Sequence, residues 1–281
     1  MSAFSIEMVC FSAPNISSVD ALLFDDNSAV FNELQWQSWD ACVYDCIIKS
    51  KELMAEVTDS TLPMIWLLPA LSFQDELKQL LTQSLQQLYP DHSNELIFHG
   101  STGAHSAIAL AGEKKWQKFN VIALDATFKA NKQQQFVYQG VGGALAVVEM
   151  VPCGWSQVSH EIAASIDFSK HNQLAGMLTR LAEQTENKID LIFAPGNGVD
   201  DDSWLNNLQL LTSLIDEHTY YELPNYKLGK IGALEGLVNL YQLTTSPAIV
   251  EHFSYALMLS QEQAKHQGAA SYLWISEEVD S

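Results

Sequence analysis

The residues of this chain whose types and spacing could support chemistry are concentrated in the stretch 95–125. A short β-rich run from Glu95 to His99 is followed by a turn of small residues, Gly100 to Gly103, and then by a helix with little side-chain bulk. Such a tight turn between a strand and a helix exposes the residue at its apex and aims backbone N–H groups at whatever binds there. This is the geometry of a nucleophile elbow, which is typical of enzymes that form covalent intermediates.

Three polar side chains at this turn are candidates for function. Ser101 lies one place past the apex, where it is either a nucleophile or, as we expect, a cap for the following helix. Thr102 follows it, and both belong to the candidate pocket. His99 alternates with Phe98 on the strand and is expected to be packed or to face solvent. The residue types alone leave the catalytic and the structural interpretation open.

The same stretch resembles the active-site segment of β-ketoacyl synthases. That family has the pattern Cys-Ser-Thr-Gly-Ala-His, then a helix of small residues and an apolar strand. Ser101 to His105 match the pattern, which marks His105 as a structural helix position, and the apolar run Asn120 to Leu124 matches the strand. Gly140 to Glu149 is similar to the glycine-led strand that ends the first half of these enzymes. The nucleophilic cysteine of the family falls on Gly100, which has no side chain.

A second family motif, Ala-His-Gly-Thr, aligns with residues 194–197. Its histidine falls on Pro195, and Gly196 and Asn197 remain candidates for lining a pocket. A third motif, Gly-His-x-x-Gly-Ala, aligns before Ala233. Its histidine falls on Gly229, or on Lys230 if one gap is allowed.

The resemblance also implies positions for two further features of the family. The lysine that precedes the third motif falls on Pro224, or on Lys227 if the register slips. The glycine- and phenylalanine-rich loop before the last strand corresponds to Gln261 to Gly268, which contains no phenylalanine.

Decarboxylating condensation needs a thiolate, two N–H-rich side chains and an oxyanion hole. With Gly100, Pro195 and Gly229 or Lys230 at the family's catalytic positions, the resemblance implies a protein without catalytic residues. Such a protein would resemble the chain-length factor, a partner or acyl-binding subunit in fatty acid or polyketide synthesis. The implied partners are a second copy, an active ketosynthase or an acyl carrier protein. The alternative is a divergent acyltransferase or thioester hydrolase that uses Ser101 or another group.

The elements that must position these residues follow from hydrophobic periodicity, glycine and proline punctuation, and the resemblance. We expect an α/β protein with the layered αβαβα arrangement of the thiolase fold, shortened, in which residues 1–150 and 151–281 form two pseudo-symmetric halves. Small-residue helices at 104–116 and 231–243 are expected to lie between two mixed sheets, and Gly232 and Gly236 indicate close backbone approach. Other predicted strands are Phe4–Phe11, Met64–Leu68, Glu161–Phe168, Ile189–Phe193, Phe253–Leu259 and Ala270–Ile275. Predicted helices are Trp36–Glu56, Phe73–Tyr89, Gln173–Glu186, Ser203–His218 and Lys227–Leu243, with a polar loop at Phe128–Phe136.

Composition limits the classes of partner. Lys and Arg total 14 against 34 Asp and Glu, so the net charge of −20 argues against nucleic acid and anionic membranes. Lys114, Lys115 and Lys118 are a local basic cluster that could receive an acidic carrier. We expect no cofactor and no metal: Asp200–Asp202 is interpreted as a solvated helix start, and Cys42 and Cys46 as core residues of a helix. No signal sequence is visible at the N-terminus, and a reducing cytoplasm is expected.

Overall fold

The computed structural model describes residues 2–13, 18, 34, 38–71, 74–131, 135–164, 173–196, 203–262 and 266–276. The elements of the first half are, in chain order, β1 (Ala3–Ser12), α2 (Trp39–Ala55), β2 (Met64–Leu67), α3 (Asp75–Leu88), β3 (Asn94–Ile97), the 3₁₀ turn η1 (Gly100–Thr102), α4 (Gly103–Lys114), β4 (Lys118–Ala130) and β5 (Phe136–Val151). Those of the second half are β6 (Gly154–Ala164), α5 (Gln173–Gln184), β7 (Leu191–Phe193), the 3₁₀ helix η2 (Ser203–Leu211), β8 (Tyr220–Glu222), α6 (Asn225–Leu228), α7 (Ala233–Thr245), α8 (Pro247–His252), β9 (Tyr255–Glu262) and β10 (His266–Ile275).

The two halves repeat one topology. The strand order is β1-β5-β4-β2-β3 in the first half and β6-β10-β9-β7-β8 in the second. The directions also correspond, because β5 and β10 run antiparallel to β1 and β6, whereas β2–β3 and β7–β8 are parallel pairs. The halves meet where Phe4 of β1 pairs with Trp155 of β6, which makes the described strands one continuous ten-stranded sheet and not the two separate sheets that we expected. The predicted pseudo-symmetry is therefore confirmed.

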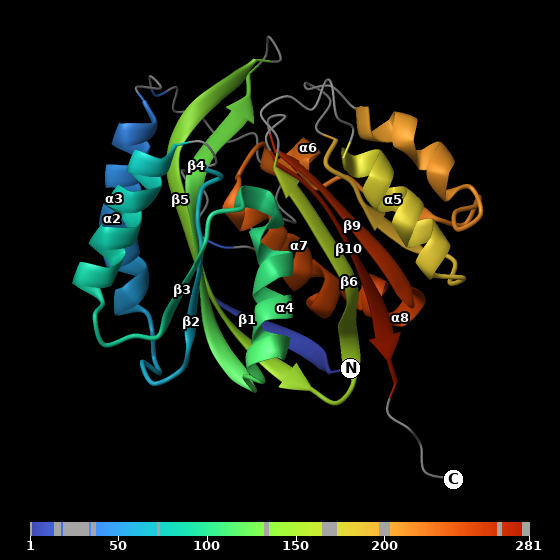
Figure 1. Cartoon of the computed structure of the whole chain (residues 1–281), viewed down its shortest axis with the longest axis horizontal. Coiled ribbons are helices and arrows are strands. Elements are labelled where there is room, and N and C mark those ends of the chain that lie inside the picture. The colour runs from blue at the N-terminus through green and yellow to red at the C-terminus, as the bar shows by residue number, and fades with distance from the viewer. Residues whose placement is uncertain are drawn as a thin grey trace.

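The helices form three layers around the strands. α2 and α3 cover the outer face of the first half of the sheet, α5 covers the outer face of the second half, and α4 and α7 lie between the two (Figure 1). The alternation of β2 shows how the sequence produces this layering. Met64 and Trp66 belong to the outer apolar cluster, whereas Ile65 and Leu67 belong to the central one. The predicted αβαβα arrangement is confirmed.

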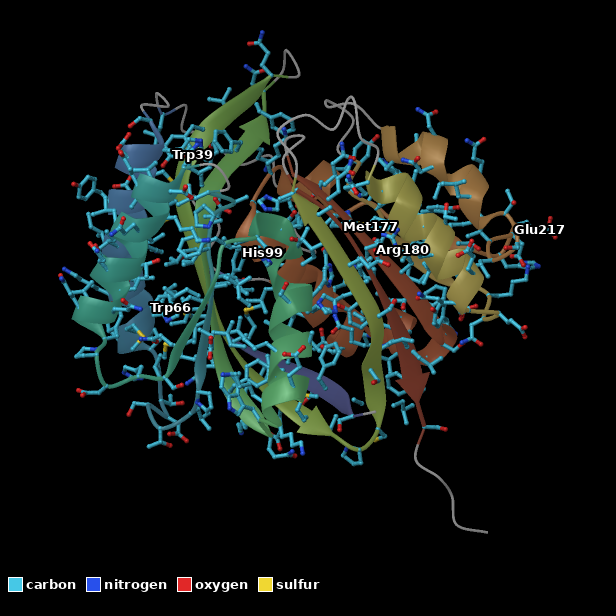
Figure 2. All side chains as sticks on the ribbon, in the orientation of Figure 1. Trp39, Trp66, His99, Met177, Arg180 and Glu217 are labelled. Atoms are coloured by element: carbon cyan, nitrogen blue, oxygen red, sulfur yellow. The ribbon has the colours of Figure 1, made fainter. Side chains whose placement is uncertain are left out.

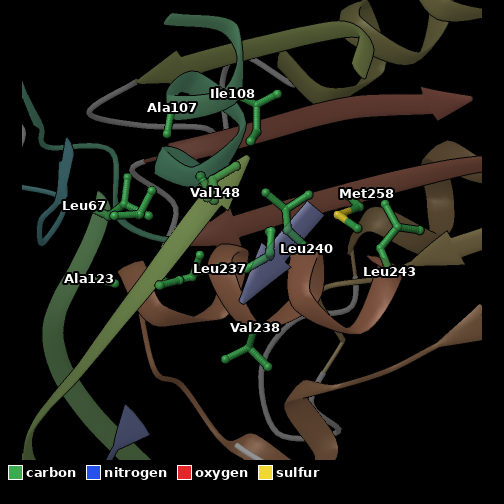
Figure 3. Close-up of a cluster of buried hydrophobic side chains, with 14 of the residues drawn as sticks. Leu67, Ala107, Ile108, Ala123, Val148, Leu237, Val238, Leu240, Leu243 and Met258 are labelled. Atoms are coloured by element: carbon green, nitrogen blue, oxygen red, sulfur yellow. The ribbon is translucent and has the colours of Figure 1, made fainter. Parts of the chain in front are cut away.

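The central layer depends on small residues. Ala104, Ala107 and Ala111 of α4 are buried, and α7 is buried along most of its length beside them (Figure 3). A Cβ atom added at Gly236 of α7 would lie 2.5 Å from the carbonyl oxygen of Ser101. Larger side chains here would push the two helices apart, which would open the densely packed core. The close backbone approach predicted at Gly236 is therefore confirmed.

Some predicted boundaries were wrong. The helix predicted at 227–243 is broken between α6 and α7, because Gly229 and Gly232 adopt positive φ angles of 71° and 53°. Of the helix predicted over 203–218, only Ser203–Leu211 is helical, and this segment is a 3₁₀ helix.

Three predicted boundaries between strands and loops also differ from the structure. The polar loop predicted at 128–136 is partly strand, since Phe128 packs on Tyr138 with ring centroids 5.5 Å apart and prolongs β4 to Ala130. β6 begins at Gly154 instead of Glu161, and residues 165–168 of that prediction lie outside the described residues. Gln261–Glu262 and 266–268 belong to β9 and β10, so the predicted closing loop is largely a strand hairpin.

Candidate functional site

The elbow predicted from the sequence is present. β3 leads through His99 into η1, and Gly100 takes a φ of 54°, a left-handed conformation that glycine adopts without a side-chain clash. α4 then begins at Gly103 with Thr102 at its N-cap position. Ser101 therefore does not occupy the cap position that we expected, because the 3₁₀ turn delays the start of the helix to Gly103.

The apex of the elbow is closed by its surroundings. Ser101 and Thr102 are only 1% and 0% exposed. A Cβ atom added at Gly268 of β10 would lie 2.8 Å from Cγ2 of Thr102, so β10 lies directly against the apex. Backbone N–H groups are also engaged: Gly100 N donates to the carbonyl oxygen of Leu68 at 3.1 Å, and Thr102 N donates to that of His99 at 3.2 Å. These two N–H groups are consequently not directed at a ligand.

His99 lies beside the first turn of α4 (Figure 2) and contacts two polar side chains. Its Nδ1 is 3.1 Å from Oγ of Ser106, and its ring centroid is 6.0 Å from that of His266. Burial is the main reason that the pKa of His99 lies below its ordinary value, with Lys78 and His160 adding to the effect. At neutral pH His99 is therefore a neutral imidazole that can accept the Ser106 proton. Sequence reasoning missed Ser106, because it is the 3₁₀ turn between β3 and α4 that brings Ser106 next to His99, and no local pattern predicts that turn.

His105, by contrast, is enclosed. Its Nδ1 lies 2.6 Å from the hydroxyl oxygen of Tyr272, and Gln157 Nε2 donates to the His105 carbonyl oxygen at 3.1 Å. Burial, assisted by His160, lowers the pKa of His105 to about 3, whereas burial raises that of Tyr272. The phenol therefore donates its proton to a neutral imidazole. This arrangement agrees with the structural role expected for His105.

The second-half candidates are separated by the fold. Pro195 and Gly196 follow β7 and are buried, and the carbonyl oxygen of Pro195 accepts a hydrogen bond of 3.1 Å from Asn225 Nδ2. Asn197 lies outside the described residues, as do residues 200–202. The backbone of Lys227 is in α6.

Gly229 and Lys230 face the end of β4. A Cβ atom at Gly229 would overlap the carbonyl oxygen of Phe128, so this position accommodates only glycine. Lys230 and Phe128 exchange two backbone hydrogen bonds of 2.8 Å. The Lys230 ammonium lies 4.2 Å from the ring centroid of Phe136, which is a cation–π contact. The ammonium is thus held against β5.

A carboxylate that sequence reasoning did not identify connects the halves. Asp125 of β4 is 1% exposed, and its Oδ2 accepts a 2.8 Å hydrogen bond from the backbone N of Ala233 at the start of α7. Its Oδ1 accepts a 2.7 Å hydrogen bond from Ala126 N. A Cβ atom at Gly232 would overlap this carboxylate, so the position of the Asp125 side chain depends on a glycine at 232. An acid at the end of the apolar run NVIALD was the available signal, but nothing nearby in sequence indicates its partner.

The described part of the chain contains several side chains of the types that bind metals. Its histidines, cysteines and acids form no group of three that could hold a metal ion. Cys42 and Cys46 are buried in α2, as expected for core residues. Among the described residues, the structure has no helix of the length and apolar character needed to cross a membrane.

The fold and the elbow together define a class, the thiolase-like fold of ketosynthases. A β-ketoacyl synthase from Burkholderia phymatum STM815 superimposes with a TM-score of 0.54 at 12% identity, over 98% of this chain and 100% of that chain. A chain of AntDE:AntF, a type II polyketide synthase acyl-carrier protein in complex with its ketosynthase, gives 0.52 at 13% identity, over 98% and 100%. The acyltransferase ChlB3 gives 0.50 at 12% identity, over 98% and 97%. No protein-family model and no curated protein matches the sequence.

Proposed function

We propose that this chain is a thiolase-fold protein that does not condense acyl groups and acts as a ketosynthase-like partner or acyl-binding subunit in fatty acid or polyketide-type synthesis. The observation that carries the proposal is the closed apex: Gly100 has no side chain, and its N–H is bonded to Leu68. Of the two positions where the resemblance implies histidines, Pro195 offers no side-chain donor, and the other is Gly229, which has no side chain, or Lys230, whose ammonium lies over the Phe136 ring. An enolate formed here would lack the groups that stabilise it.

In this role the protein would act through its surfaces. β3 is an edge strand of the described sheet, so its outer backbone groups are available to a strand of a second copy or of an active ketosynthase. We propose that the two halves divide between residues 150 and 151, at the last residue of β5, and that each half contributes one helix, α4 or α7, to the shared core. Four free cysteines suit the reducing cytoplasm that we propose as its compartment.

An acyl carrier protein is a further proposed partner, and its docking would depend on the basic cluster at the end of α4. Lys114 pairs with Glu95 at 3.0 Å, and Lys118 pairs with Glu149 at 3.3 Å. These acids partly offset the attraction for an acidic carrier, so we expect weak binding that salt abolishes. Titration of the carrier at low and high ionic strength would measure it.

The test of the proposal is release of carbon dioxide from a malonyl thioester. We expect no release above background from the unmodified chain, with a complete ketosynthase as positive control in the same assay. Gly100→Cys should give at most slow acylation, seen as an intact-mass adduct, and still no condensation, because the enolate stays unsupported. Release above background by the unmodified protein would show that the proposal is wrong.

The alternative, an acyltransferase or thioester hydrolase, is favoured by one specific observation, the 3.1 Å contact between Ser106 and His99. Both side chains are half-buried, whereas Ser101 is 1% exposed. In this reaction Ser106 Oγ would attack the thioester carbonyl carbon while its proton passes to His99. The thiol would leave with that proton, and water would then cleave the ester.

Incubation with an acyl thioester, followed by intact-mass measurement, tests this alternative. It requires an acyl adduct or thiol release that Ser106→Ala and His99→Phe abolish and Ser101→Ala preserves. The absence of adduct and thiol release in the unmodified chain would leave the non-condensing partner as the only proposal.

A further inference from the structure

Two contacts between side chains fix α4 alongside β3 (Figure 1). Lys114, at the end of the helix, pairs with Glu95 of β3 at 3.0 Å, and Ser106, near its start, lies 3.1 Å from His99, which follows β3. The chain from Glu95 to His99 spans about 13 Å when extended, and that from Ser106 to Lys114 spans about 12 Å as a helix. The two segments therefore run side by side in opposite directions over this length.

One face of α4 stays partly exposed beside this strand. We call it the open face of α4, and it consists of Ser106, Ala109, Leu110 and Glu113. A Cβ atom added at Gly103 would lie 3.5 Å from side-chain atoms of both Leu67 and Ile97, so the helix begins above β2 and β3 together. Whatever extends the sheet beyond β3 must therefore pass next to the open face of α4.

The backbone of β3 can accept a further strand. The carbonyl oxygens of Ser93 and Ile97 accept hydrogen bonds from Met64 N and Leu68 N on the side of β2. Backbone groups of successive strand residues point to opposite sides, so those of Leu96 point to the outer edge. Among the described strands, β3 is the last on this side of the sheet. A strand added here would thus be centred near Leu96.

A second copy of β3 fits this edge. In an antiparallel pair with a two-fold axis at Leu96, this leucine lies opposite its own copy, and Glu95 lies opposite Ile97 of the second copy. An apolar pair at the centre with no like charges directly opposite favours this register. The second copy carries its own α4 above its β3, on the same face of the extended sheet. The two α4 helices then meet at their open faces.

We propose that pairing of β3 with a second copy covers Ser106, so that the Ser106–His99 pair accepts an acyl group only in the free chain. In that transfer Ser106 Oγ forms the ester bond, and its proton passes through His99 to the leaving thiol. The inference rests on the β3 dimer of the proposed function and makes that assembly exclude the reaction proposed as its alternative. The dimer is the unacylated partner, and the free chain is the form with an accessible serine.

Labelling of a thiol introduced at position 106 tests this cover without requiring catalysis. Ser106→Cys is made together with Cys10→Ser and Cys153→Ser, which replace the two partly exposed cysteines. Iodoacetamide labelling followed by intact mass gives the rate, and sedimentation gives the fraction of dimer at each concentration. Where about nine-tenths of the chains are dimeric, the rate should fall to about a tenth of the monomer rate. Glu217→Cys in the same background, at a side chain 87% exposed on the second half (Figure 2), is the control and should react equally fast throughout.

Two changes at Leu96 break the pairing but leave the hydrogen bonds between β3 and β2. Leu96→Lys places like charges opposite each other at the axis, and Leu96→Pro removes an N–H that faces the edge. Each should keep labelling at position 106 at the monomer rate at every concentration. If Leu96→Pro loses its circular-dichroism signal, Leu96→Lys decides alone.

The outcomes separate this inference from the proposed function. A dimer whose position 106 is labelled as fast as in the monomer overturns the inference and leaves the β3 dimer standing. A dimer that survives the changes at Leu96, or a strict monomer at all concentrations, overturns both.

Discussion

Protonation of His105 should destabilise the folded chain in a defined pH window. The imidazole is 1% exposed and its pKa is lowered to about 3, against an ordinary value of 6.5. Between these two values the unfolded chain binds a proton that the folded chain does not. Stability is therefore fully present above about pH 6.5, declines as the pH falls, and stops declining on this account near pH 3.

The size of the effect follows from linkage. Each pH unit within the window costs about 1.4 kcal/mol for one such group. At pH 5 the free energy of unfolding should therefore be lower by about 2 kcal/mol than at pH 7.5 through His105 alone. This is a large part of the roughly 5–15 kcal/mol that stabilises a typical domain.

Other groups titrate as well, so the measurement must isolate His105. His105→Asn removes the titrating ring but keeps an acceptor near the Nδ1 position that receives the Tyr272 proton. Urea unfolding, followed by circular dichroism at pH 7.5, 6.5, 5.8 and 5, gives the free energy of both proteins. The advantage of the unmodified chain over the variant should shrink by about 2 kcal/mol between pH 7.5 and 5. His218→Asn, the same change at an exposed histidine, serves as the control. If the difference for His105→Asn does not change with pH, the enclosed neutral imidazole is refuted.

The remaining predictions concern packing and assembly. Gly236→Ala should lower the free energy of unfolding, because overpacking against Ser101 costs about 1–3 kcal/mol and exceeds the roughly 1 kcal/mol gained in helix propensity. Gly112→Ala, with nothing within 4 Å of its added Cβ, should be neutral or stabilising in the same denaturation assay. Asp125→Ala should cost about 2 kcal/mol, since the N-terminus of α7 loses its side-chain acceptor, and an unchanged unfolding midpoint would contradict this. Sedimentation at micromolar concentration should show a dimer formed through β3, and a strict monomer would contradict that assignment.

The parts of the fold that the sequence predicted are those with local signals. The elbow needed only a β-rich run, glycines at 100 and 103, and alanines at helical spacing. β2 and α4 were likewise recognised from short patterns of apolar or small residues. The layered arrangement came from the order of these elements together with the family resemblance, because periodicity alone does not choose between folds.

What the sequence could not predict depends on contacts between distant segments. The hydrogen bond between His105 and Tyr272 joins residues 167 positions apart, and that between Asp125 and Ala233 joins residues 108 apart. The break before α7 was missed for a related reason. A glycine in a helical pattern is either a packing site or a helix end. At 236 it is the former and at 232 the latter, and only the partner, Ser101 or Asp125, distinguishes them.

The same reasoning limits what an elbow motif says about chemistry. The run Gly100–His105 specifies a turn and a helix start, but the reactivity of the apex depends on whether β10 and α7 leave it open. Here Gly268 and Gly236 are positions where these elements approach the elbow closely, and a side chain at either would collide with Thr102 or Ser101. The absence of those side chains lets the second half close over the elbow. A chain of this fold can therefore keep the turn and the small-residue helix of an elbow while its apex becomes part of the core.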